Sequence, residues 1–392
     1  MKRLFITAFL ITSSLQAMSL SELINASLQK SPSLDVINKR IAANKHAIDV
    51  ADQFDNPEIL LTKNTIGASQ AMSQTVVTLK QKIPYYSKRQ KRTEIKKAQK
   101  GVLTESLRDA KIKLVERIKE EAYRIWELRE LRSIINEYIE ITKNNIRLYE
   151  SYTSVSDNQH MGIMKAELSL SDLEVQRAEL DAKIDTAYAQ LSYLSALKVT
   201  ALEINLTIEK RPNLKKLENS LQANPDIALQ NEEIRKQRAS VALADVNKYP
   251  DVNLIAGYAY REKFDNYFNF GVALKLPIYG TEEAKEEEAR AILLAKQSQK
   301  SDTLLAVHAE LRTYYAQMLA SYNIYHIIND QALPQVAHMF ELSSSSIATG
   351  SDLFKYIDVL FEKLNLEEKS IVAITNYKRA QAQIAKLRGD LQ

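Results

Sequence analysis

A cluster of soft metal ligands lies before the middle of the chain, at His160, Met161 and Met164. Thioether sulfur and imidazole nitrogen are ligands that suit monovalent copper, so the cluster could bind such an ion. Two methionines and a histidine near the start of a helix also occur as ordinary packing and surface residues. We adopt this second interpretation, and the sequence then contains no metal site.

No other residues have the spacing of a catalytic or cofactor-binding motif. The remaining histidines form no ligand set: His46, His308, His326 and His338. The sequence contains no glycine-rich phosphate loop, no nucleophile elbow and no His-Glu-x-x-His motif. It also contains no cysteine, which excludes disulfides, thiolate metal ligands and cysteine nucleophiles. We therefore expect neither an enzyme nor a bound cofactor.

The composition favours long amphipathic helices over a compact enzyme core. Of the 392 residues, 45% are hydrophobic and 26% charged, while only 7% are aromatic. The formal net charge is +4, and no basic stripe is interleaved with aromatic residues. Nucleic acid is therefore not an expected partner.

Residues 1–17 have the pattern of a cleavable secretory signal peptide. Lys2 and Arg3 supply the positive charge, Leu4 to Leu15 the short apolar region, and Ala17 a cleavage site. No later stretch approaches roughly 20 uninterrupted apolar residues, so we expect no transmembrane helix. Any membrane span would have to be built from strands.

The chain after the signal is a duplication, because prolines recur at one constant offset. The matching pairs are Pro32 with Pro225, Pro57 with Pro250, and Pro84 with Pro277. A repeat of this kind indicates two copies of one structural device. We predict a first repeat over residues 18–197, a connector over 198–216 and a second repeat over 217–392.

Each repeat contains two predicted strands. Phe268, Phe270 and Val272 are apolar at every second residue, which is the signature of a strand with one apolar face. The four predicted strands lie near residues 58–65, 74–83, 251–260 and 266–276. Their lengths are close to what a tilted strand needs to cross a bilayer.

Four strands are too few to close a barrel, since the smallest known types have about eight. Open strand edges in lipid leave backbone groups unpaired, which is very costly. Self-association is therefore required, and three copies would close a 12-stranded barrel.

The rest of each repeat is predicted to be a long helical hairpin. Between Gly101 and Gly162 there is neither glycine nor proline, and apolar residues recur at spacings of three and four. The chain turns near residues 151–162 in the first repeat and near 347–351 in the second, whose long helix is interrupted at Pro334. A helix of this length is on the order of 100 Å long and needs similar neighbours, as in a coiled-coil array. The expected fold class is mainly α with a small β part.

The order and duplication of these elements resemble the TolC outer-membrane efflux family. The resemblance rests on the strand end Leu276-Pro277-Ile278-Tyr279-Gly280 and on Ala348-Thr349-Gly350-Ser351-Asp352 followed by Ile357-Asp358-Val359-Leu360. It covers both repeats. Within the family the sequence looks most similar to outer-membrane components of heavy-metal resistance-nodulation-division pumps.

The resemblance implies a homotrimer in the cell outer membrane. Its strands would form one barrel in contact with outer-membrane lipid, and its helices would form a long periplasmic tunnel. The inner end of this tunnel would open when a periplasmic adaptor (membrane fusion) protein and an inner-membrane resistance-nodulation-division pump engage. The protein itself would perform no chemistry.

The resemblance also implies four site residues. Asp358 and Asp352 would form the pore constriction, where three symmetry copies of an aspartate attract cations and repel one another. The alternatives are a solvated helix face for Asp358 and a helix cap for Asp352. Gly162 and Gly350 would lie at the hairpin turns where the adaptor docks, although turn geometry alone also favours glycine.

The expected function is the exit duct of a tripartite efflux system that exports small toxic compounds or metal ions. Two alternatives remain open. The duct could instead serve a type I protein secretion system. The chain could also be a periplasmic coiled-coil scaffold or adaptor, but an adaptor would need a lipoyl-like β domain and would not associate with the outer membrane.

Overall fold

The computed structural model describes residues 18–64, 73–152, 157–208, 210–211, 213–347 and 353–391. These residues form two compact units, and each unit takes segments from both sequence repeats. The hairpin unit takes the described residues within 18–32, 111–222 and 309–391, and the sheet unit those within 33–110 and 223–308. The predicted signal peptide lies outside the described residues.

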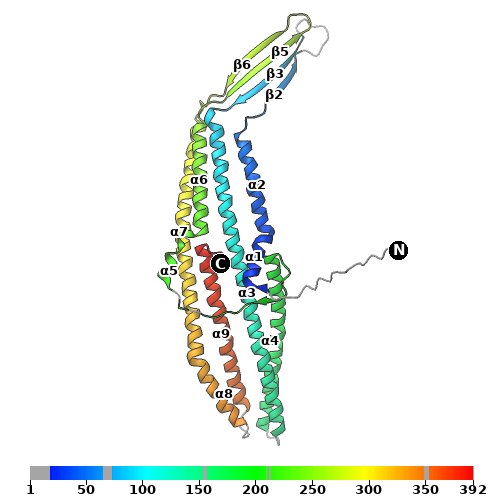
Figure 1. The fold of residues 1–392 in the computed structure, drawn as a ribbon, viewed down its shortest axis with the longest axis vertical. Helices are drawn as coiled ribbons and strands as arrows, with labels where there is room; N and C mark the ends of the chain where they lie inside the picture. Colours follow the sequence, from blue (N-terminus) through cyan, green and yellow to red (C-terminus); the bar gives the residue numbers. More distant parts are fainter. Residues whose placement is uncertain are drawn as a thin grey trace, which may run out of the picture. The chain divides into compact units, whose positions relative to one another are not determined.

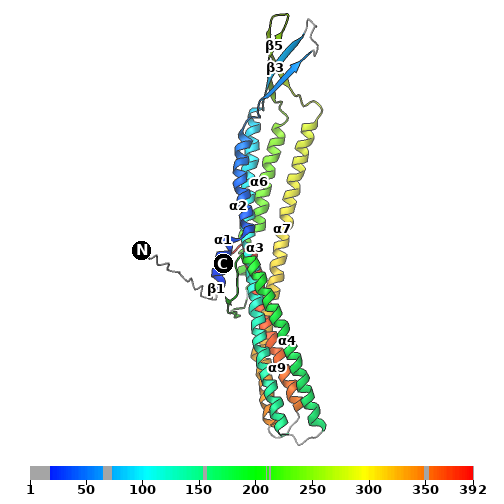
Figure 2. The same cartoon turned by 90° about the vertical axis from the view of Figure 1, so that its right-hand side faces the viewer.

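The hairpin unit is almost entirely helical. Its elements are β1 (Met18–Ser19), α1 (Leu20–Lys30), the later parts of α3 (Tyr86–Tyr152) and α7 (Thr281–Ile327), α4 (Asp157–Ser195), β4 (Leu202–Glu203), α5 (Leu214–Glu218), α8 (Leu333–Ile347) and α9 (Leu353–Arg388). The strands β1 and β4 form a short parallel pair that the sequence analysis did not predict. In Figure 2, α9 lies beside the parts of α3 and α4 that belong to this unit.

Apolar residues at heptad spacing hold these helices together. On α9 the buried residues Ile357, Leu360 and Leu364 repeat at spacings of three and four. On α3 the fully buried isoleucines Ile118 and Ile125 are seven residues apart. The only tryptophan of the chain, Trp126, packs in a cluster that contains residues of α3, α9 and the connector: Tyr123, Leu206, Ile371 and Ala382.

The break predicted at Pro334 is a local change of helix type. A π-helical segment, Ile328–Ala332, separates α7 from α8, and the Leu333 N–H donates to the Ile328 carbonyl five residues back. Proline has no N–H to donate and its ring clashes with the preceding turn. The wider π turn accommodates this proline without ending the helix.

The sheet unit combines four strands with helices. Its helices are α2 (Pro32–Asp52), α6 (Pro225–Val246) and the first parts of α3 and α7, and its strands are β2 (Glu58–Lys63), β3 (Gln74–Ile83), β5 (Val252–Arg261) and β6 (Tyr267–Leu274). These strands agree with the four predicted ones to within a few residues. They form one antiparallel sheet in the order β2-β3-β5-β6 (Figure 1).

The strand pair of one repeat therefore joins the pair of the other through β3 and β5, and β2 and β6 form the two edges of the sheet. Every strand is connected to a helix at the same end of the sheet, which we call the helix end. Among the described residues, no helix is both long and apolar enough to cross a membrane.

Candidate functional site

An ion pair joins the two helical hairpins at the predicted constriction residue. Lys165 on α4 places its Nζ 2.5 Å from Asp358 Oδ1 on α9. The carboxylate is 61% exposed and the ammonium 28% exposed, so water still reaches both groups. Asp358 is thus on a partly solvated helix face and also forms a contact between helices from different repeats.

Tyrosine hydroxyls form further links between α3 and α9. The buried Tyr138 hydroxyl donates to Glu367 Oε2 at 3.0 Å. The buried Tyr356 hydroxyl accepts from Asn145 Nδ2 at 2.9 Å. Burial raises the pKa of Tyr138, and the adjacent Glu367 carboxylate raises it further. These neutral tyrosines fix the two helices relative to each other in the region around Asp358.

A buried and a half-buried carboxylate continue the contact between α3 and α9. Glu127 Oε2 lies 3.1 Å from the Arg379 guanidinium, and Glu116 Oε1 accepts from Gln383 Nε2 at 2.6 Å. Burial raises the pKa of both carboxyl groups, although Arg379 opposes this shift at Glu127. The two hairpins are therefore joined by polar as well as apolar contacts.

The other predicted site residues are located differently. Gly162 is buried inside the first two turns of α4, so its prediction as a turn residue is wrong: α3 ends at Tyr152 and α4 begins at Asp157. Asp352 and Gly350 lie outside the described residues.

The soft-ligand cluster lies on the surface of α4. Met161 is 62% exposed and Met164 56% exposed, and His160 is exposed as well. In the described part of the chain, no group of three or more histidines and acidic residues is arranged to hold a metal ion.

The sheet has one apolar face and one polar face. Register places Leu61, Val77, Tyr258 and Phe268 in one row across the four strands. The next row on the same face is also apolar, with Ile59, Leu79, Ala256 and Phe270. The large residues of both rows are exposed, and Phe270 is 82% exposed. An exposed apolar face of this size indicates contact with lipid or another apolar partner.

The opposite face is more polar, because small and polar side chains outnumber the apolar ones on it. Its central row contains Leu60, Thr78, Gly257 and Asn269. A Cβ atom on Gly257 would lie 2.0 Å from Asn269 Oδ1, so glycine leaves room for that amide. Strands that alternate between an apolar and a polar face are typical of a barrel with a wet interior.

At the helix end of the sheet, a buried lysine joins a strand to a helix. Lys88 Nζ at the start of α3 donates to the Tyr249 carbonyl at 2.6 Å and lies 2.8 Å from Asp251 Oδ1. The rings of Tyr85 and Tyr249 stack with their centroids 4.6 Å apart. Lys88 can be buried because Asp251, which is 163 residues away along the chain, balances its charge.

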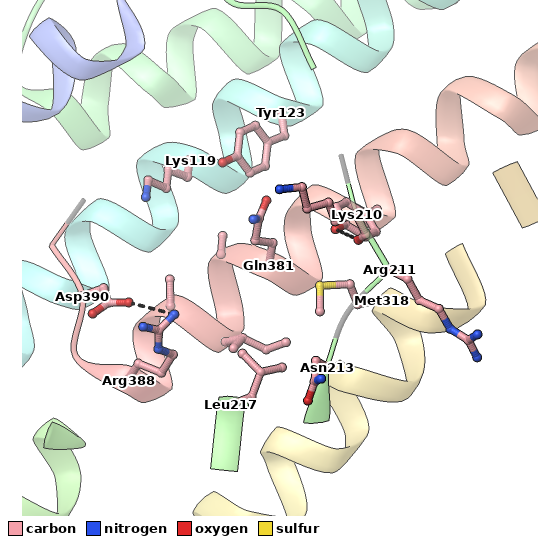
Figure 3. Close-up of a pocket in the computed structure, with 14 residues that line it drawn as sticks. Lys119, Tyr123, Lys210, Arg211, Asn213, Leu217, Met318, Gln381, Arg388 and Asp390 are labelled. Atoms are coloured by element: carbon pink, nitrogen blue, oxygen red, sulfur yellow. Dashed lines mark hydrogen bonds and ion pairs between the residues drawn. The ribbon is translucent and has the colours of Figure 1, made fainter. Parts of the chain in front are cut away.

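A cavity of about 480 Å³ in the hairpin unit is lined by α3, α7, α9 and the connector. Figure 3 shows that Lys119, Lys210 and Gln381 contribute polar atoms to it, while Arg388 pairs with Asp390 at 3.4 Å. Burial lowers the pKa of Lys119, and Asp390 opposes this shift. This cavity could not be predicted from local sequence patterns, because its walls come from four distant segments.

Comparison with known proteins agrees with this architecture. Residues 217–392 match the family model of the outer membrane efflux proteins. The match covers the second repeat, which is a little under half of the chain. No curated protein sequence matches the chain.

Solved structures of outer-membrane channels share the fold of this chain. Crystal structures of CusC match with a TM-score of 0.79 and 12% identity, covering 95% of this chain and 92% of that chain. The open state of the Neisseria gonorrhoeae MtrE channel matches with a TM-score of 0.80 and 14% identity, covering 95% and 89%. VceC of Vibrio cholerae matches with 0.77 and 15%, covering 95% and 96%.

The family and these structures are transport ducts rather than enzymes. This agrees with the expectation from the sequence that the protein performs no chemistry.

Proposed function

We propose that the chain is the outer-membrane exit duct of a tripartite efflux system and acts as a homotrimer. The observation that carries this proposal is the four-stranded sheet with an exposed apolar face and two edge strands. Such a sheet is unstable alone in lipid, because each edge leaves backbone donors and acceptors unpaired. Three copies would pair β6 of one chain with β2 of the next and close a 12-stranded barrel.

In this trimer the apolar face contacts outer-membrane lipid and the polar face lines a water-filled lumen. The helical hairpins form a periplasmic tunnel. A periplasmic adaptor protein docks near the hairpin turns, close to Gly162 and Gly350, and links the duct to an inner-membrane resistance-nodulation-division pump. Small toxic compounds or metal ions leave the cell through this path.

In this proposal Asp358 and Asp352 narrow the tunnel. The Lys165 ammonium holds the Asp358 carboxylate against α4. Opening of the tunnel separates the hairpins and breaks this contact. The similarity of the fold to the open MtrE channel supports the proposal, because a relative of this fold does open.

Strand pairing between chains can be tested by disulfide cross-linking. The chain contains no cysteine, so introduced pairs report on one contact without background. Leu60→Cys on β2 is combined in turn with Asn269→Cys or Ala273→Cys on β6, and outer-membrane vesicles are oxidised. We expect at least one pair to give a covalent trimer.

The matched control is Val76→Cys with Ala259→Cys, which are register partners on β3 and β5 of the same chain. This pair should form an intrachain disulfide and no larger species. The proposal fails if the edge pairs stay monomeric while the control pair oxidises, or if the protein is absent from the outer membrane.

A further inference from the structure

A cavity of about 420 Å³ opens at the helix end of the sheet. It is lined by polar-face residues of the strands and by the first turn of α7, and four of its side chains are lysines: Lys82, Lys88, Lys275 and Lys285. It belongs entirely to the sheet unit. The charges of these lysines determine which ions the cavity attracts.

Two of the four lysines are neutralised by aspartates. Lys82 Nζ lies 3.2 Å from Asp55 Oδ2 and 3.5 Å from Asp251 Oδ2. Lys88 Nζ contacts the other oxygen of Asp251. The pKa of Asp251 is lowered although burial raises it, because Lys88, the Tyr85 N–H and Lys82 stabilise the carboxylate. Two lysines and two aspartates therefore balance.

The third lysine is balanced as well, and the fourth is not. Lys285 Nζ lies 3.1 Å from Glu282 Oε1 one turn away on α7. Lys275, directly after β6, is exposed and makes no hydrogen bond or ion pair within the described residues. The cavity thus carries one unbalanced positive charge per chain.

Continuing the alternation of β6 by one residue places Lys275 on the polar face of the sheet. Asn269, Gly271 and Ala273 lie on the polar face of β6, whereas Leu274 and Leu276 follow the apolar face. In the proposed trimer the polar face is the wall of the lumen. Three Lys275 side chains would then surround the path at the point where the helices join the barrel.

We propose that Lys275 forms an anion-attracting ring inside the duct and gives it a preference for anionic solutes at the barrel mouth. This inference rests on the proposed function. At about 10 Å from three ammonium groups in 0.1 M salt, a monovalent anion is enriched about twofold and an anion with three or four charges about tenfold. A narrow, low-dielectric wall focuses such a field further.

The test is electrical and uses the purified full-length protein in planar lipid bilayers. The reversal potential under a potassium chloride gradient measures anion against cation preference, and block by inorganic tripolyphosphate measures attraction of a polyvalent anion. Lys275→Gln should shift the reversal potential towards cations and raise the half-blocking tripolyphosphate concentration about tenfold. Lys275→Arg should behave like the unmodified protein.

The matched control is Lys63→Gln. Lys63 also lies on a sheet strand, but its register with Thr75 places it on the apolar face. It should change neither readout. The inference is overturned if Lys275→Gln conducts with unchanged selectivity and unchanged block, or if Lys63→Gln shifts both equally. Absence of conductance from the unmodified trimer would instead contradict the proposed duct, so the two failures differ.

Discussion

Removal of the Lys165 ammonium should favour the open tunnel. The Lys165–Asp358 pair is the contact between α4 and α9 that opening would break, and Asp358 is 61% exposed. Exposed ion pairs contribute about 0.5 kcal/mol, because water and salt screen them. Three copies in a trimer contribute about 1.5 kcal/mol, which corresponds to about a tenfold change in the ratio of closed to open channels.

Single-channel recording of Lys165→Gln measures this ratio as open probability. We expect about a tenfold increase at low salt and a smaller one at high ionic strength, where screening has already weakened the pair. Asp358→Asn should raise the open probability similarly, and the double variant should add nothing, since both substitutions remove one contact.

Lys143→Gln provides the control for this prediction. Lys143 pairs with Glu174 at 3.3 Å with comparable exposure, but it joins α3 to α4 within one hairpin. Opening that separates the two hairpins leaves this pair intact. The reasoning is refuted if Lys143→Gln opens the channel as much as Lys165→Gln, or if Lys165→Gln leaves the open probability unchanged.

Two further predictions concern the helices around this contact. Tyr138→Phe should lower the free energy of unfolding by about 1–2 kcal/mol, because Glu367 loses a buried hydrogen-bond donor. Thermal melts should show this loss. The control Tyr193→Phe should show no loss, because Tyr193 is 78% exposed. Burial raises the pKa of Glu368 above its ordinary value of 4.5, because the charged carboxylate is poorly solvated in the folded protein. The protonated carboxyl group is therefore compatible with folding, and the charged one opposes it. Stability is lost as pH rises from 4.5 through the raised pKa. Glu368→Gln should therefore raise the melting temperature at pH 7 and leave it unchanged below pH 4.5; an unchanged melting temperature at pH 7 would count against this assignment.

Local periodicity predicted the elements of the fold. Alternation of apolar residues around Phe268 and Phe270 depends on the geometry of one strand. The three-residue spacing of Ile357 and Leu360 depends on the geometry of one helix. Both patterns are therefore visible in a short window of sequence. The repeated prolines also marked where the strands begin and end, because proline interrupts regular hydrogen bonding in any context.

Contacts between distant segments were beyond this reasoning. Lys165 and Asp358 are 193 residues apart, and nothing in the neighbourhood of either residue indicates the other. The same holds for Lys88 and Asp251. Gly162 was placed at a turn by the family resemblance, and turn geometry favours glycine, yet the structure keeps it inside α4. The partner of each of these side chains depends on how the two repeats pack together, and the sequence of one repeat does not specify that packing.

The central claim, that the chain is an efflux duct, is tested most directly in a strain from which its gene has been deleted. Susceptibility is measured for monovalent and divalent metals, bile salts, dyes and antibiotics, with the intact gene restored on a plasmid. The account predicts sensitivity to at least one class of these small compounds and its reversal by the restored gene. Unchanged resistance to every compound, together with loss of a secreted protein from the medium, would contradict it and identify a protein secretion duct.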